Sequence, residues 1–543
     1  MSEHTDIRIA GRTLAPGLVI GGAFVYREPT EAPPEPDDIE QHQIAEELRR
    51  LDRAMAAVRE DLRISAHRIE ADTDAKLAAI FQAHEAMLQD PSLLQEIRAA
   101  VEGELISATQ ALARVFRRWE RKFREMAQPA QQQTAEDLAD LRRRLLREMT
   151  GVKTTALEKM PAGRVLVARR LLPSDTVALP RRAVTGIILE FGGPGSHAAL
   201  LAEALGIPTV AQIPNAREII ADDDVLIVDG FRGEIVVNPD AATLARYTEE
   251  IEGAQARSAE LKQSARQPAC TRDGTKIAVM ANVGCREDVT TAVEHGADGV
   301  GLYRLEQFYL SRKTPPTAVE LLADLREMFA PLRGKPITVR LLDLGGDKPL
   351  PFLKLPPEDN PFLGRRGVRL LLRYPDLLDT QLQALWQFAR DHDVRILVPM
   401  VTLAEEMALV RMRFAAVAKD AGQIELPPLG AMIETPAAAL SVADIIAYAD
   451  FLSIGTNDLT QYTMAAGREN PLVSEYFRED HPAVLRLVRI VVEEAGRVPV
   501  AVCGELARQF DAVPTLLKLG IRSLSVAPPL VPGVKEAVRQ AAL

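Results

Sequence analysis

The spacing of apolar residues changes along the chain, and each change predicts a different kind of structure. Residues 6–26 carry short, mostly apolar runs on either side of a Pro-Gly turn, which indicates strands. From 37 to 149, apolar residues recur every three or four positions and glycine is almost absent. This period predicts a bundle of about four long amphipathic helices, with a loop at 128–133.

Strand-like apolar runs return between 162 and 239, at 165–168, 184–189, 225–229 and 234–237. Since the strands of residues 6–26 cannot fold alone, the simplest topology joins them to this segment, and the bundle becomes an insertion into one α/β domain. We therefore place the α/β domain at 1–34 and 150–240 and the helical domain at 35–149. The charged, proline-free stretch that follows predicts a linker helix at 241–267.

The C-terminal part, residues 268–543, alternates apolar runs with helical patterns about eight times. The runs lie at 276–283, 299–303, 337–343, 396–401, 429–433, 451–455, 498–503 and 523–526. Eight strands of parallel type with helices between them predict a (β/α)₈ barrel. The fold class expected from the sequence is thus a multidomain α/β protein, in which a barrel follows a smaller α/β domain with an inserted helical bundle.

Composition excludes several classes of protein. The length of 543 residues favours three or four domains. Because 76 acidic residues outnumber 65 basic ones, for a net charge of −11, and no block of Lys and Arg stands out, nucleic-acid binding is disfavoured. The N-terminus lacks an apolar signal core and no segment approaches the ~20 apolar residues of a membrane span, so we expect a cytoplasmic protein. Three scattered cysteines, Cys270, Cys285 and Cys503, do not make a disulfide framework or a zinc site.

One histidine stands in a context that favours chemistry. His197 belongs to the glycine-rich run GGPGSHAALL at 192–201, between the apolar run at 184–189 and a helix-forming run at 198–205. Unpaired N–H groups and the positive end of the helix dipole disfavour imidazolium there and favour the neutral form, which can attack phosphorus. A histidine that merely caps the helix would show the same pattern. His84, in the helical domain, is assigned instead to packing or to a partner surface.

Polar residues stand on or just after five of the predicted barrel strands. They are Arg304, Arg340, Glu434, the pair Asn457 and Asp458, and Cys503. Barrel enzymes build their sites from the carboxyl ends of several strands, so we expect these groups to converge on one mouth. Two arginines beside carboxylates suit a substrate rich in anionic oxygen, and Glu434 and Asp458 supply hard oxygen ligands for Mg²⁺. Taken singly, either carboxylate is equally consistent with a helix N-cap or a salt bridge.

Cys503 has a role of its own in this cluster, and two further residues extend it. Cys503 differs from the other cysteines because a thiol at a strand end facing the cluster is placed to deliver a proton to a carbon atom. A buried and inert cysteine would give the same pattern. Arg366 and Arg468 are additional candidates for the cluster, although a solvated arginine is the alternative interpretation of each.

Several motifs, in order, make the sequence resemble enzyme I of the bacterial phosphoenolpyruvate-dependent sugar phosphotransferase system over essentially its whole length. The most specific are GGPGSHAALLAEALGIPTV at 192–210, DGVGLYRLEQFYL at 298–310, VRLLDLGGDKP at 339–349, NPFLGRRGVR at 360–369, GAMIETPAA at 430–438, SIGTNDLTQYTMAAGREN at 453–470 and AVCGELA at 501–507. The resemblance implies a swivelling phosphohistidine α/β domain, a helical domain that docks a small histidine-containing phosphocarrier protein, and a barrel that binds phosphoenolpyruvate and forms a homodimer.

The resemblance also implies roles for single residues. His197 matches the phosphorylated histidine, with the phosphate on Nε2, and Cys503 matches the acid that protonates the enolate carbon. Glu434 and Asp458 match Mg²⁺ ligands. The residues that match the phosphoenolpyruvate-binding positions are Arg304, Arg340, Asn457, Asp458 and Arg468, and Arg366 lies in a matching arginine motif.

The sequence departs from the family pattern near the expected site. Pro194 and Gly195 replace Arg and Thr, Leu172 and Leu305 replace Thr, and Gly467 replaces Asp. These changes leave two alternatives open, a divergent paralogue that feeds a regulatory carrier and a catalytically impaired carrier-binding protein. The related dikinases and synthases need a nucleotide-binding domain, for which this chain offers no room, and a barrel-only lyase would not need His197.

Overall fold

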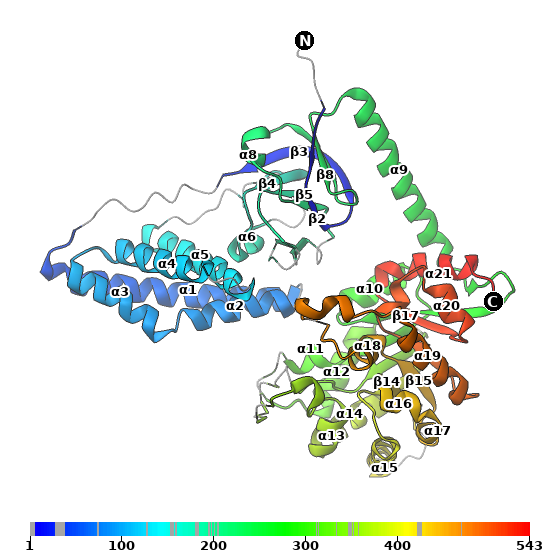
Figure 1. Cartoon of the computed structure of the whole chain (residues 1–543). Coiled ribbons are helices and arrows are strands. Elements are labelled where there is room, and N and C mark those ends of the chain that lie inside the picture. The colour runs from blue at the N-terminus through cyan, green and yellow to red at the C-terminus, as the bar shows by residue number, and fades with distance from the viewer. Residues whose placement is uncertain are drawn as a thin grey trace. The chain divides into compact units, whose positions relative to one another are not determined.

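The computed structural model of the chain describes most of its residues. The described residues are 6–27, 38–72, 75–125, 129–151, 157, 160–179, 184–193, 196, 198–199, 201–202, 206–310, 312, 314–332, 334–345, 350, 352–353, 355–356, 358–420, 426–468 and 470–543. They form two compact units, Met1–Gln255 and Ala256–Leu543, which divide inside the long helix α9 (Ala241–Ser264). Figure 1 shows this helix in green.

The sheet of the first unit contains strands from both ends of that unit. Its order is β1-β8-β7-β3-β4-β5-β6-β2. The strands are β1 (Ile7–Ala10), β2 (Arg12–Ala15), β3 (Leu18–Tyr26), β4 (Arg164–Ala168), β5 (Val184–Leu189), β6 (Thr209–Ala211), β7 (Val225–Asp229) and β8 (Glu234–Val237). Because β3 pairs with both β4 and β7, the N-terminal strands complete a sheet whose other strands follow the helical bundle. The short helices α6 (Pro173–Ala178) and α8 (Ala216–Ile219) follow β4 and β6.

The helical bundle lies between β3 and β4 in the sequence. Its helices are α1 (Ile44–Asp72), α2 (Ala75–Met87), α3 (Pro91–Glu104), α4 (Ala108–Arg124) and α5 (Pro129–Thr150). The loop expected at 128–133 is wrong for residues 129–133, because α5 begins at Pro129. Proline suits the first position of a helix, where its missing N–H would have no partner. A single apolar core runs from Leu51 and Phe116 of the bundle to Leu166 and Ile187 of the sheet, so the two parts of this unit pack together.

The second unit is a closed parallel barrel. Its strands are β10 (Lys276–Val283), β11 (Val300–Arg304), β12 (Ile337–Arg340), β13 (Val394–Val398), β14 (Leu429–Ile433), β15 (Phe451–Ile454), β16 (Val500–Val502) and β17 (Ser523–Val526), and β9 (Ala269–Cys270) pairs antiparallel with β10. The barrel closes because β10 pairs with both β11 and β17. The predicted fold class, including the eight-stranded barrel, is therefore confirmed.

Helices surround the barrel (Figure 1). They are α10 (Arg286–Glu294), α11 (Glu306–Leu310), α12 (Ala318–Phe329), α13 (Val368–Arg373), α14 (Pro375–Phe388), α15 (Ala404–Asp420), α16 (Pro436–Leu440), α17 (Val442–Ile445), α18 (Thr456–Met464), α19 (Pro482–Ala495), α20 (Val513–Lys518) and α21 (Val531–Gln540). The large apolar core of the unit fills the space between these helices and the strands. Within the described part of the chain, every helix is too short or too polar to cross a membrane.

Candidate active site

The carboxyl ends of the barrel strands hold most of the residues that the sequence singled out. Arg304 ends β11 and Arg340 ends β12, and the two arginines are partners in the strand register. Glu434 directly follows β14 and Cys503 directly follows β16. Asp458 lies in the first turn of α18, just after β15. The parallel strands therefore bring these side chains to one end of the barrel, as expected for a barrel enzyme.

Arg340 is held by two carboxylates. Its Nη2 donates to Glu306 Oε1 at 2.8 Å, and its Nη1 lies 3.2 Å from Asp343 Oδ2. The same Glu306 oxygen accepts the backbone N–H of Asp343 at 2.9 Å. Burial acts to lower the pKa of Arg340, but the charges of Glu306 and Asp343 outweigh it and raise the pKa, so the guanidinium stays charged. The Arg340 guanidinium is thus held in one orientation before any ligand binds.

Arg366 joins the cluster more closely than the sequence suggested. Its Nε and Nη2 donate to the two oxygens of Asp343 at 3.2 and 2.8 Å, which is a bidentate pair. Its Nη1 donates to Asp458 Oδ1 at 3.1 Å. Arg366 is buried, so this guanidinium ties the loop after β12 to the start of α18. A solvated role for Arg366 is therefore ruled out by its contacts.

Glu434 is a buried carboxyl group among other carboxylates. The residue is 1% exposed, and its Oε1 accepts the backbone N–H of Met400 at 2.6 Å. Burial, followed by the charges of Asp458 and Asp343, raises the pKa of Glu434 to about 8. A side chain on Gly455 would place its Cβ 2.7 Å from Glu434 Oε2, so the backbone can approach this carboxylate only at a glycine.

The donor set at this end of the barrel suits Mg²⁺. That ion binds one or two protein carboxylates and takes its remaining oxygen ligands from substrate and water. Glu434 and Asp458 are near enough for each charge to affect the other, and a bound cation would relieve their repulsion. Among the described residues, no group of three or more His, Cys, Asp or Glu side chains is arranged to hold a metal ion by itself.

Arg304 is a further cation of the cluster, and two other arginines act on it. Arg304 is an exposed residue, yet desolvation of its guanidinium, followed by the charge of Arg340, lowers its pKa. Arg468 acts in the same direction, so three cations influence one another here. An anionic ligand would relieve this repulsion. Asn457 lies in the first turn of α18, and its Oδ1 accepts the backbone N–H of Glu505 at 2.8 Å.

Cys503 is buried at the same end of the barrel. It is 4% exposed, and burial raises the pKa of its thiol, which therefore stays protonated at neutral pH. The hydroxyl of Ser453 donates to Cys503 Sγ at 3.2 Å, and Sγ lies 3.6 Å from the carbonyl oxygen of Ile454. A protonated thiol near the arginines fits an acid better than a nucleophile, because attack requires the thiolate.

His197 lies outside the described residues, as do Pro194 and Gly195. On either side of it, Ser196 Oγ accepts the backbone N–H of Ala199 at 3.3 Å, and residues 198–199 and 201–202 are helical. The strand that precedes this segment, β5, runs parallel to β4. The start of α6, which follows β4, therefore lies at the same edge of the sheet as residues 190–193, which follow β5.

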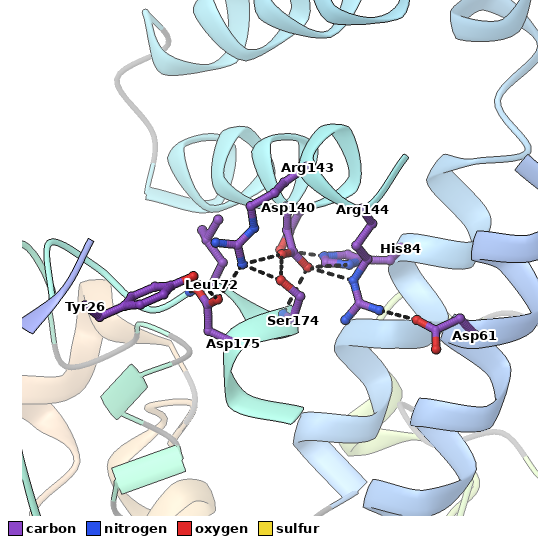
Figure 2. A network of polar contacts seen from close by, with 10 residues as sticks. Tyr26, Asp61, His84, Asp140, Arg143, Arg144, Leu172, Ser174 and Asp175 are labelled. Carbon is purple, nitrogen blue, oxygen red and sulfur yellow. Dashed lines mark hydrogen bonds and ion pairs between the residues drawn. The ribbon is translucent and has the colours of Figure 1, made fainter. Parts of the chain in front are cut away.

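A buried ionic cluster, shown in Figure 2, fixes α6 against the helical bundle. Asp175 of α6 accepts the backbone N–H of Leu172 at 2.9 Å and the Arg143 guanidinium at 2.7 Å. Asp140 of α5 accepts the backbone N–H of Ser174 at 3.1 Å and also binds its hydroxyl. We call the four charged groups Asp140, Arg143, Arg144 and Asp175 the junction cluster.

His84 packs against the junction cluster. Its Nε2 lies 3.0 Å from Asp137 Oδ1, and its Nδ1 lies 3.7 Å from Asp140 Oδ2. The side chain is completely buried in the bundle. Its assignment to packing is confirmed, and a surface for a partner protein is excluded for this residue.

The departures from the family pattern fall at three described positions. Leu172 and Leu305 are buried apolar residues, so neither supplies a hydroxyl to the site. A Cβ at Gly467 would meet only Asn470 Cβ, at 3.7 Å, so a side chain there would have space. The structure gives no further reason for glycine at 467.

Three residues of the cluster were missed by sequence reasoning. Asp343 ends the predicted strand at 337–343, and its position alone would have included it in a search for strand-end carboxylates. Glu306 follows Arg304 by two residues but opens a helix, so it has no strand-end signal. Ser453 lies inside β15, where the sequence shows only a small residue in an apolar run.

Family models match nearly the whole chain. The PEP-binding domain of PEP-utilising enzymes matches residues 258–543, the mobile domain of these enzymes matches 160–233, and their N-terminal domain matches 10–134. Taken with a barrel that gathers arginines and carboxylates at the carboxyl ends of its strands, these matches place the protein among the PEP-utilising enzymes.

Sequence comparison with individual relatives identifies the family within the PEP-utilising enzymes. A phosphoenolpyruvate-protein phosphotransferase from Geobacillus stearothermophilus is 35% identical over 530 residues, which cover 96% of this chain and 90% of the relative. The enzyme of that name from Haloferax volcanii is 36% identical over 550 residues (99% and 95%), and that from Bacillus subtilis is 34% identical over 522 residues (94% and 90%). The chain belongs to the phosphoenolpyruvate-protein phosphotransferase family, enzyme I, as its motifs indicate.

Proposed function

We propose that this chain transfers the phosphoryl group of phosphoenolpyruvate to His197 and then to a histidine of a small phosphocarrier protein, with release of pyruvate. The observation that carries the proposal is the convergence of Arg304, Arg340 and Arg366 with Glu434 and Asp458 at one end of the barrel. Phosphoryl transfer is catalysed mainly by positioning and by neutralising charge on the transferred group, and these residues supply both. The names of the relatives and their coverage of the chain support the same reaction.

The arginines are assigned to the substrate. Phosphoenolpyruvate carries a phosphate and a carboxylate, and the mutual repulsion of Arg304, Arg340 and Arg468 would be relieved by such an anion. Arg340 is already oriented by Glu306 and Asp343, so little side-chain entropy is lost when it binds a phosphoryl oxygen. Arg366 is assigned a positioning role, because it binds the carboxylates of Asp343 and Asp458 and holds them in place.

Glu434 and Asp458 are proposed to hold Mg²⁺, and Asn457 is proposed to contact the substrate beside them. A magnesium ion bound there supplies charge neutralisation for the phosphoryl oxygens. Because the pKa of Glu434 is raised to about 8, this carboxyl group must lose a proton before it can serve as a ligand.

The bonds that change are few. The P–O bond to the enol oxygen breaks, and a P–N bond forms at Nε2 of His197. Cys503 then gives its thiol proton to the methylene carbon of the enolate, which yields pyruvate. The phosphoryl group passes from His197 to the carrier, for which the helical domain is the proposed docking surface. The proposed carrier is a small protein that accepts the phosphoryl group on a histidine. Homodimerisation through the barrel is a separate prediction.

A coupled assay tests the proposal. Pyruvate release is followed with wild-type protein, Mg²⁺ and phosphoenolpyruvate, with and without a histidine phosphocarrier protein. We expect one pyruvate per chain without the carrier and continuous release with it. Arg340→Met should lower kcat/KM by ~10²-fold or more, because it removes the charged group proposed to bind a phosphoryl oxygen. The control is Arg326→Met, on an exposed arginine paired with Asp391, which should leave kcat/KM unchanged. Continuous release without any carrier would contradict the proposal.

A further inference from the structure

Cys503 is enclosed, although its proposed role requires it to lose and regain a proton in every cycle. It packs in a small interior cluster with Leu302, Leu397, Met432 and Phe451. This inference rests on the proposed function, in which each turnover leaves a buried thiolate behind. A buried charge of this kind is costly, so a nearby group must return the proton before the next cycle.

Ser453 is placed to return that proton. It is the third residue of β15, is 2% exposed, and donates its hydroxyl hydrogen bond to Cys503 Sγ at 3.2 Å. Among the described residues, it is the one hydroxyl group hydrogen-bonded to this thiol. A hydroxyl group can donate through its proton while it accepts another on a lone pair, which is the property a proton relay needs.

Ser453 also lines a cavity that leads away from the catalytic end of the barrel. The cavity has a volume of about 340 Å³. Its wall includes Thr338, Arg395, Phe451 and Ser523, each of which is the first or second residue of its strand. Arg340, Glu434 and Cys503 stand at the opposite, carboxyl ends of the strands. The cavity therefore approaches the thiol from the side that substrate does not use.

The wall of this cavity is largely apolar but offers polar groups that water can bind. A water molecule occupies roughly 30 Å³ and needs two to four polar partners, so the space holds on the order of ten molecules. Polar groups are available from Thr338, Ser523 and Ser525, and from Arg395, whose side chain has no hydrogen bond or ion pair within the described part of the chain. Ser525 in turn donates to Asn282 Oδ1 at 2.6 Å, and Asn282 donates to the carbonyl oxygen of Cys503 at 3.0 Å.

We propose that Ser453 is the proton relay that recharges Cys503, and that its protons come from water in this cavity at the amino end of the barrel. In the acid step, the S–H bond breaks and a C–H bond forms with the π electron pair of the enolate, while sulfur keeps the pair of the S–H bond. In the recharging step, the Ser453 hydroxyl proton moves to the thiolate as a water molecule passes a proton to Ser453 Oγ. The hydroxide that remains is neutralised by a solvent proton, so each pyruvate takes one proton from solvent.

Rapid-quench measurement of pyruvate separates this role from a structural one. In Ser453→Ala, with the phosphocarrier protein in excess, the first turnover uses a thiol that is already protonated. We therefore expect a burst of one pyruvate per active site at the wild-type rate. Later turnovers should then be slower by at least about tenfold, because positioned proton transfer commonly contributes ~10²–10⁴-fold.

A matched pair of variants provides the control. Ser453→Thr keeps the hydroxyl group and Ser453→Val has the same size without it, and both β-branched residues suit a strand. Threonine should restore wild-type steady-state release, whereas valine should show the burst followed by slow release. Ser523→Leu fills the cavity without contacting the thiol, and it should also show the burst. Thermal unfolding of each variant verifies that the barrel is folded.

Two results would overturn the relay. Ser453→Val with the wild-type steady-state rate would remove the hydroxyl group from the cycle. A first turnover slowed as much as the later ones would mean that Ser453 only positions Cys503. Failure of the proposed function looks different, because then the wild-type protein itself releases no pyruvate.

Discussion

Removal of the Arg143 guanidinium should destabilise the first unit strongly, because it would leave two buried carboxylates short of a cation. Arg143 Nη2 lies 2.7 Å from Asp175 Oδ1 and 3.4 Å from Asp140 Oδ1. Asp175 is 1% exposed and Asp140 is completely buried. Burial alone would raise the pKa of Asp140, but Arg144 and Arg143 hold it below its usual value, so this carboxylate depends on its cations to remain ionised.

The magnitude follows from these contacts. Breaking a buried ion pair by removal of one partner typically costs ~3–5 kcal/mol. Since a unit of this size loses ~2–4 °C of Tm for each kcal/mol, Arg143→Met should lower the Tm of the first unit by about 6–20 °C. The matched control is Arg114→Met, which removes an exposed ion pair with Glu104. Exposed pairs contribute ~0–1 kcal/mol, so this change should lower the Tm by at most ~4 °C.

The two tryptophans of the chain allow a direct assay. Trp119 lies in α4 of the first unit, and Trp386 lies in α14 of the barrel. In a Trp386→Phe background, Trp119 fluorescence reports the unfolding of the first unit alone. If Arg143→Met and Arg114→Met lower this Tm equally, the junction cluster does not stabilise the unit and the reasoning from burial is refuted.

Further predictions concern the barrel. Glu306→Gln should raise the KM for phosphoenolpyruvate about tenfold or more in steady-state assays, because the charge that orients Arg340 is lost. The control is Glu327→Gln, at an exposed glutamate. An unchanged KM in Glu306→Gln would contradict this role. With its pKa raised to about 8, Glu434 is about nine-tenths protonated at pH 7, so Mg²⁺ binding should release close to one proton. Calorimetry of Mg²⁺ binding in buffers of different ionisation enthalpy measures this number of protons. No proton release, or the same release in Glu434→Gln, would contradict the metal assignment. Burial raises the pKa of Glu479 from 4.5 to about 7, so its contribution to stability is complete below pH 4.5 and is lost as pH rises through 7. The barrel Tm of Glu479→Gln should therefore rise relative to wild type between pH 5 and pH 8, and a constant difference would refute this.

Most of the fold could be predicted because apolar spacing is a local property of the sequence. All eight barrel strands appear near their expected positions. The short strand β6 (Thr209–Ala211) was missed because three residues carry no measurable period. The start of α5 at Pro129 was missed because a glutamine-rich stretch after a proline is typical of loops as well as of helix ends.

The candidate site was predictable where a residue marks a strand end. Arg340, Glu434 and Cys503 stand where the rule for barrel enzymes expects functional groups, whereas Glu306 acts through a contact between a helix and a neighbouring strand. Such pairings depend on how elements separated in sequence pack together. The junction cluster was unpredictable for the same reason, because Arg143 and Asp175 are paired only by the packing of α5 against α6.

Incubation with Mg²⁺ and phosphoenolpyruvate labelled on phosphorus, followed by peptide mapping, tests the central claim most directly. We expect one acid-labile, alkali-stable phosphate on the peptide that contains His197, its transfer to the carrier, and no label in His197→Ala. Label that persists in His197→Ala, or that maps to any other residue of the wild-type chain, would contradict it.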